Sequence, residues 1–158
     1  MKTATVKELK TELSYLSQKE VMELCLKLSK FKIENKELLT YLLFESTDED
    51  SYIEKIKIEV DEQFEAINTK SYFYIKKSVR KILRTIKKHI RYSKKKETEI
   101  ELLLHFCKKL KEFKPSVKNN TTLQNIFFRE KEAVKKKLLL VHEDLQYDYG
   151  IELEKLIL

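Results

Sequence analysis

Residues 71–92 have the sequence SYFYIKKSVRKILRTIKKHIRY, and the spacing within this stretch decides the fold class. Its apolar side chains recur every three or four residues, at Tyr72, Ile75, Val79, Ile82 and Ile86. In an α-helix this spacing puts them on one face and leaves the lysines and arginines on the others. The stretch therefore predicts a long amphipathic helix with one face packed on a core.

The same periodicity recurs on both sides of this stretch and predicts about eight helices. Ser17 and Glu20 have the spacing of a capping box, which starts the second helix. Polar residues break the periodicity at 46–50 and 68–69, Pro115 ends a helix, and residues 147–150 predict a bend near the C-terminus. We expect helices over about residues 6–16, 17–31, 35–44, 50–67, 71–92, 97–113, 121–145 and 151–158.

Glycine and proline are scarce, since the 158 residues contain one of each. β-Sheets need frequent turns that are commonly built from glycine, whereas a few short loops can join helices. The composition therefore favours an all-α fold of antiparallel helix pairs, stacked as a bundle or as a short helical-repeat-like array. The length predicts a single domain over residues 1–158. Residues 97–113 are apolar on more than one face, which predicts a central helix.

Apolar residues make up 42% of the chain and charged residues 37%, a balance typical of a folded soluble protein. The apolar runs are too short to span a bilayer, and the first residues lack the apolar core of a secretory signal. We therefore expect a cytoplasmic protein. Cys25 and Cys107 each lie in an apolar helical stripe, which predicts that both are buried rather than reactive.

Charge is unevenly distributed along the chain. Residues 70–96 contain twelve lysines or arginines and no acid, whereas residues 45–65 contain nine acids and two lysines. The two blocks are neighbours in sequence, so the acidic helix is a natural counter-charge for the basic one. The net charge of the whole chain is +7.

A basic stripe on the predicted helix 71–92 is the strongest candidate binding surface. Three interpretations are open: a solvated face paired with the preceding acidic helix, a sequence-independent nucleic-acid site, or a surface for a protein or membrane partner. No short glycine-containing turn precedes a recognition helix, so we do not expect base-specific binding. The candidate contact residues are Lys76, Arg80, Arg84, Lys87, Lys88, Arg91 and Lys95.

Two aromatic residues lie beside the apolar seams of their helices. Phe73 follows Tyr72 at the start of the basic helix, and Phe128 follows Phe127 in the predicted helix 121–145. We expect core packing for both, with exposure in an interaction surface as the alternative.

The residues available for catalysis and metal binding are few. No histidine has a glutamate three residues before it, as dimetal bundles require, and neither a His-x-x-x-His nor a Cys-x-x-Cys pair occurs. The best pair is Glu101 with His105, one helical turn apart, for which a surface ion pair is the simpler interpretation. Gly150 is the only glycine, so a phosphate-binding loop is not expected. We predict neither an enzyme nor a cofactor.

The N-terminal third carries a leucine-patterned helix pair, Leu9–Ser17 and Glu20–Leu24, followed by the helix start Asn35-Lys36-Glu37 and its continuation to Leu42. This arrangement resembles a family of small all-helical bacterial proteins of unknown function. The resemblance implies a stack of antiparallel helices and supplies no functional residues.

Taken with the composition, these features predict a non-enzymatic interaction or scaffold protein of a bacterial cytoplasm that uses a charged helical face. A protein partner or self-association is the expected mode of action. The alternative is a sequence-independent nucleic-acid-binding protein that uses the basic helix 70–96.

Overall fold

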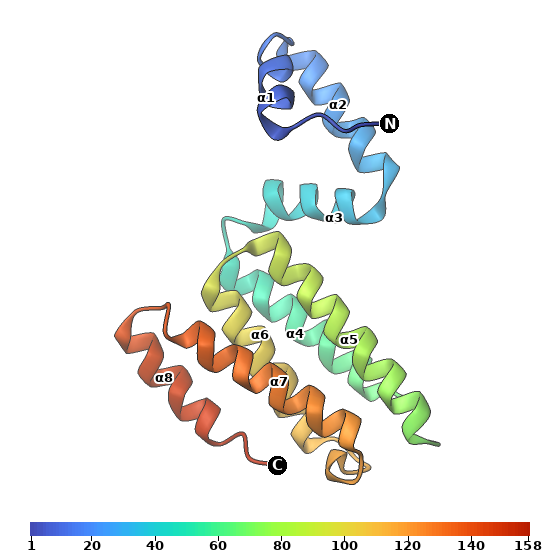
Figure 1. Cartoon of the computed structure of the whole chain (residues 1–158), viewed down its shortest axis with the longest axis vertical. Helices are drawn as coiled ribbons and strands as arrows, with labels where there is room; N and C mark the ends of the chain where they lie inside the picture. The colour runs from blue at the N-terminus through green and yellow to red at the C-terminus, as the bar shows by residue number, and fades with distance from the viewer. The chain divides into compact units, whose positions relative to one another are not determined.

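The computed structural model describes all of residues 1–158 and contains eight α-helices and no strand (Figure 1). The all-α fold with about eight helices is therefore confirmed. A short π-helical turn, η1 (Tyr41–Glu45), follows α3, and a 3-10 turn, η2 (Val117–Asn119), precedes α7. The α-helices are α1 (Val6–Ser14), α2 (Gln18–Phe31), α3 (Ile33–Thr40), α4 (Glu49–Glu65), α5 (Tyr72–Ser93), α6 (Lys96–Glu112), α7 (Thr121–Leu138) and α8 (Glu143–Glu154).

Internal contacts divide the chain into two compact units, Met1–Phe44 and Glu45–Leu158. The first unit contains α1, α2 and α3, and the second contains α4 to α8. The single domain over residues 1–158 stays a prediction from the chain length.

Consecutive helices of the second unit run antiparallel. Glu49 at the start of α4 meets Ser93 at the end of α5, and Glu99 at the start of α6 pairs with Lys137 at the end of α7 at 2.7 Å. Helix α6 packs against α4, α5, α7 and α8, which confirms its predicted central place.

The core of this unit consists of the apolar seams that the sequence periodicity predicts. On α5, Ile75, Val79, Ile82 and Ile86 are all buried. Helix α6 contributes eight buried residues from several faces, among them Phe106, which stacks at a tilt on Phe64 of α4 with ring centroids 5.9 Å apart. The contact between the two rings fixes the position of α4 on the central helix.

A polar cluster closes the end of the bundle where α4 begins and α5 turns into α6. One oxygen of the Glu49 carboxylate accepts hydrogen bonds from the hydroxyls of Ser93 and Thr98, and the other pairs with Lys95 at 2.9 Å. Thr98 is fully buried. The acidic start of α4 therefore holds the α5–α6 turn in place.

The predicted path of the last two helices is wrong. Helix α7 ends at Leu138 instead of near 145, and Gly150 lies inside α8 instead of at a bend. The break falls at residues 139–142 because the His142 side chain accepts a hydrogen bond from the Asp144 amide and caps α8. Acidic residues in the first turn of α8 add a favourable interaction with the helix dipole.

The first unit has a different character, because α1, α2 and α3 contain no buried residue. The capping box of Ser17 and Glu20 is confirmed, and α2 packs against α3. Cys107 is buried as predicted, but the prediction for Cys25 is wrong because this residue is exposed. Its apolar stripe exists on α2, yet no other layer of the unit covers that stripe.

Candidate functional site

A groove of about 1060 Å³ lies between α5 and α7. Both walls carry cations: six come from α5, and Arg129 comes from α7 together with the polar residues Thr122 and Asn125. Apolar side chains of Leu83 and Ile126 also line the groove. The α5 cations in this set are Lys76, Lys77, Arg80, Arg84, Lys87 and Arg91.

The groove gathers most of the contact residues predicted from the sequence. Five of the seven, Lys76, Arg80, Arg84, Lys87 and Arg91, line it, because their spacing of three and four residues keeps them on one side of α5. The other two are elsewhere. Lys88 is not among the groove residues, and Lys95 caps the start of α6 and pairs with Glu49.

The expected pairing between the acidic and basic helices is restricted to the C-terminal end of α5. There His89 bonds to the Tyr52 hydroxyl at 2.8 Å and lies 3.8 Å from Glu59, in addition to the Glu49 contacts. Among the other carboxylates of α4, Glu54 pairs with Lys57 of the same helix, and Asp61 pairs with His105 and Lys109 of α6. The groove cations without any ion pair or side-chain hydrogen bond are Lys76, Lys77, Arg80, Arg84 and Arg91.

Glu130 of α7 is the one acid that pairs with groove cations. The Glu130 side chain is 1% exposed. Its carboxylate forms an ion pair with the Nζ of Lys87 of α5 at 2.8 Å and another with the Nε of Arg129 at 2.8 Å. Both partners stay largely exposed on the groove side. A buried charge is tolerated only when it is paired in this way, so Glu130 joins α5 to α7 beneath the groove.

Sequence reasoning missed the contribution of α7 to this surface. Thr122, Asn125 and Arg129 share one helical face, but no sequence signal says which helix lies opposite α5. The prediction that Phe73 and Phe128 pack in the core is also wrong. Phe73 lines the groove with 66% of its surface exposed, and Phe128 is 50% exposed.

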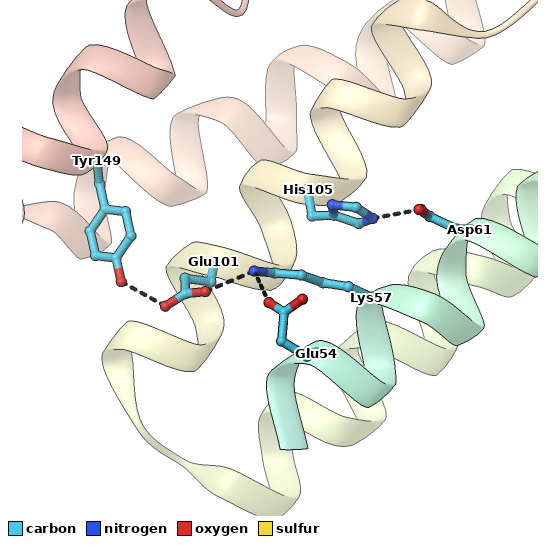
Figure 2. A network of polar contacts seen from close by, with 6 residues as sticks. All are labelled: Glu54, Lys57, Asp61, Glu101, His105 and Tyr149. Atoms are coloured by element: carbon cyan, nitrogen blue, oxygen red, sulfur yellow. Dashed lines mark hydrogen bonds and ion pairs between the residues drawn. The ribbon is translucent and has the colours of Figure 1, made fainter. Parts of the chain in front are cut away.

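A second polar site links α4, α6 and α8 (Figure 2). Lys57 of α4 donates to Glu54 at 2.7 Å and to Glu101 of α6 at 3.0 Å. The other oxygen of Glu101 accepts a hydrogen bond from the Tyr149 hydroxyl of α8 at 2.8 Å. One turn further along α6, His105 lies 2.6 Å from Asp61 of α4. A cavity of about 530 Å³ adjoins this network.

The pKa values of the network follow from these contacts. Partial burial acts against the charged form of Asp61, but hydrogen bonds and charge from His105 and Lys109 outweigh it and hold the pKa of Asp61 below its ordinary value. Burial and the hydrogen bond to Glu101 raise the pKa of Tyr149. For Lys57, the bonds to Glu54 and Glu101 outweigh the effect of burial and raise its pKa.

Glu101 and His105 therefore each bond to other side chains of this network. Both carboxylate oxygens of Glu101 have partners, and His105 bonds to Asp61. No group of three or more histidine, cysteine, aspartate or glutamate side chains is placed to hold a metal ion. The network cross-links three helices by charge-assisted hydrogen bonds, which are the stronger kind.

No protein-family model matches the chain, and neither a curated protein nor a solved structure is significantly similar to it. The resemblance of the N-terminal third to a bacterial helical family therefore stays a prediction. None of the helices has both the length and the apolar character needed to cross a bilayer.

Proposed function

We propose that this protein is a non-enzymatic interaction protein whose contact surface is the groove between α5 and α7. Its ligand is the phosphate backbone of nucleic acid, bound without sequence preference. The observation that carries this proposal is the set of five groove cations that have no acidic partner, Lys76, Lys77, Arg80, Arg84 and Arg91. Clustered cations of this kind release counterions from a phosphate backbone, which is the main source of sequence-independent affinity.

Exposed aromatic surface in the groove favours a single strand over a duplex. Phe73 lies at the edge of the cation set, and its ring meets Tyr74 edge to face, with ring centroids 5.5 Å apart. Single-strand binding proteins combine a basic groove with aromatic side chains on which bases stack, at about 1–3 kcal/mol per base. Phe73 supplies such a platform, and the arginines supply the track for the backbone.

The test is fluorescence-anisotropy titration of a labelled single strand and a matched duplex at about 50 and about 200 mM salt. With five phosphates neutralised, the slope of log affinity against log salt should be about −3.5 for the single strand and about −4.5 for the duplex. The variant Arg80→Glu, Arg84→Glu, Arg91→Glu should abolish binding and leave the helical circular dichroism signal intact.

A matched control reverses three exposed lysines outside the groove, Lys114, Lys118 and Lys136, and so changes the net charge by the same amount. This control should retain most of the binding, since only the local cations contact the strand. Equal losses in both variants, or binding that survives the arginine reversal, would contradict the proposal. Binding to polyglutamate with none to either nucleic acid would indicate an acidic protein partner instead.

The aromatic contribution is tested separately with Phe73→Ala. This variant should weaken single-strand binding by about 1–3 kcal/mol and leave duplex binding and the salt slope nearly unchanged. An equal loss for both ligands would remove the preference for a single strand.

A further inference from the structure

We infer that the Met1–Phe44 unit is a self-association module that pairs with the same unit of a second copy of the chain. This inference is independent of the groove, which belongs to the Glu45–Leu158 unit. The exposed apolar residues of the chain are concentrated in this unit. Of the twenty-four large hydrophobic residues that are exposed, fifteen lie in the first 44 residues.

The exposed apolar residues of α1 and α2 form two regular seams. In the first seam, Val6, Leu9 and Leu13 of α1 are followed by Leu16 in the turn after the helix, at intervals of three, four and three residues, and all four are exposed. The same interval recurs in α2, where Leu24, Leu28 and Phe31 are exposed and Val21 is half-buried. An alternation of three and four is the seam of helices that pack side by side with interlocking side chains.

The two seams of one unit supply two of the four helices that a four-helix bundle needs to enclose its apolar core. Four-helix bundles enclose their apolar positions with four helices joined by short loops. Here α1 and α2 are joined by only three residues, Tyr15 to Ser17, and make few contacts with each other, so the seams of both helices are available to a second copy. A hollow of about 360 Å³ beside α2 is lined by Leu16 and Leu24 and by the charged residues Glu20, Glu23 and Lys27. It can therefore take a side chain of the other copy that has an apolar stem and a charged end.

The available area matches what a stable dimer requires. Between Val6 and Phe44, fourteen large hydrophobic residues are exposed. Seven of them lie in the two seams, and if each buries roughly half of the area of a large side chain they offer on the order of 600 Å². A stable interface needs about 800 Å² from each partner, of which roughly two thirds is apolar in homodimers, so the two seams supply about the apolar share of such an interface.

The charge of the unit favours a second copy over a charged partner. Residues 1–44 contain eight lysines and six glutamates, interleaved along the helices, and so are nearly neutral. An interface between identical surfaces must be complementary to itself, which an even mixture of both signs permits. The basic groove of the other unit has no such mixture and would repel its own copy.

The first experiment is sedimentation equilibrium on the full chain over a range of concentrations. The wild type should reach twice the chain mass of 19.0 kDa at micromolar concentration. The variant Leu13→Glu, Leu24→Glu, Leu28→Glu should associate at least about 100-fold more weakly, because the interface would have to desolvate six added charges per dimer. Its circular dichroism spectrum should stay helical.

A matched control places the same three charges on exposed apolar residues of the other unit, Ile58, Leu139 and Tyr147. This control should remain dimeric. A wild type that stays at one chain mass would overturn the inference, and so would a seam variant that remains dimeric, a control that dissociates, or a wild type of three or more copies.

Cys25 gives a second readout at the seam itself. It is exposed on α2 beside Leu24 and Leu28, whereas Cys107 is buried and its pKa is raised to about 12, so a thiol reagent reports Cys25 alone. Labelling of Cys25 should slow several-fold as the concentration rises through the dimer range and should be fast at all concentrations in the seam variant. A rate independent of concentration in the wild type would exclude this face as the dimer contact.

Discussion

Replacement of Glu130 by glutamine should lower stability and strengthen nucleic-acid binding at the same time. The side chain is 1% exposed, and its two oxygens pair with Lys87 and Arg129 at 2.8 Å each. A glutamine of the same shape keeps one acceptor oxygen but turns an amide donor toward the other cation. One of the two contacts is therefore lost, and both cations gain freedom to turn into the groove.

The expected loss of stability is modest. A hydrogen bond to a charged group is worth about 1.5–3 kcal/mol, but the substitution also relieves the cost of burying a carboxylate, which is several kcal/mol before pairing. Lys87 and Arg129 are 48% and 63% exposed, so water solvates them once they are released. We expect the free energy of unfolding to fall by about 1–2 kcal/mol.

The gain in binding follows from the number of available cations. Seven cations line the groove, and a neutral glutamine ends the ion pairs of both Lys87 and Arg129, so the number of cations without an acidic partner rises from five to seven. The salt slope for a single strand should steepen from about −3.5 to about −4.9. Urea denaturation measures the first quantity, and fluorescence anisotropy at several salt concentrations measures the second.

The control is Glu132→Gln, which removes the same charge two residues away. Glu132 is exposed and pairs only with Lys135, which is not a groove residue. It should change the unfolding free energy by less than about 0.5 kcal/mol and leave the salt slope unaltered. An unchanged or weaker affinity in Glu130→Gln, with the fold intact, would refute the view that Lys87 and Arg129 compete between this carboxylate and phosphate.

Two further predictions concern the core and the polar network. Phe106→Ala should lower the free energy of unfolding, measured by urea denaturation, by about 3–5 kcal/mol, because this fully buried ring of α6 fills part of the core. A change below about 1 kcal/mol would contradict the central place of α6. The network should set the pH limits of stability, measured as the unfolding midpoint from about pH 2 to about pH 11. Because the pKa of Asp61 is lowered in the fold, its contribution is present above about pH 4 and is lost as pH falls, so Asp61→Asn should flatten the acid limb. Because the pKa of Tyr149 is raised, its contribution is present below about pH 10 and is lost as pH rises, so Tyr149→Phe should flatten the alkaline limb. Unchanged limbs in both variants would refute these assignments.

The spacing of apolar residues predicted which face of each helix is apolar. The prediction that this face is buried was correct where another helix covers it. The α5 seam and the broad apolar surface of α6 are buried as expected. The same reasoning failed for Cys25, because spacing says nothing about what lies against a face. It also failed at the end of α7, since Val141 and Leu145 continue the apolar period and the cap by His142 depends on a side-chain contact with the backbone.

The candidate site was half predictable for a related reason. The stripe from Lys76 to Arg91 follows from residues on one helix, so the sequence locates it. The opposite wall with Arg129, and the buried Glu130 beneath the groove, depend on where the packing of α7 on α6 places α7 relative to α5. In the sequence Glu130 stands among lysines and glutamates that resemble a solvated helix face, and only the tertiary structure distinguishes it from Glu132.

The arrangement of acids, more than the net charge, accounts for the groove. The chain has 26 acidic residues, enough to neutralise most of its 33 cations if they were spread evenly. In the second unit, however, α4 directs Lys57 and Asp61 toward α6, and Glu49 toward the α5–α6 turn. These contacts hold the bundle together and leave one acid, Glu130, beneath the groove. Because the counter-charges are fixed by the packing of α4 on α6, the basic surface between α5 and α7 is a consequence of the fold and persists whatever occupies it.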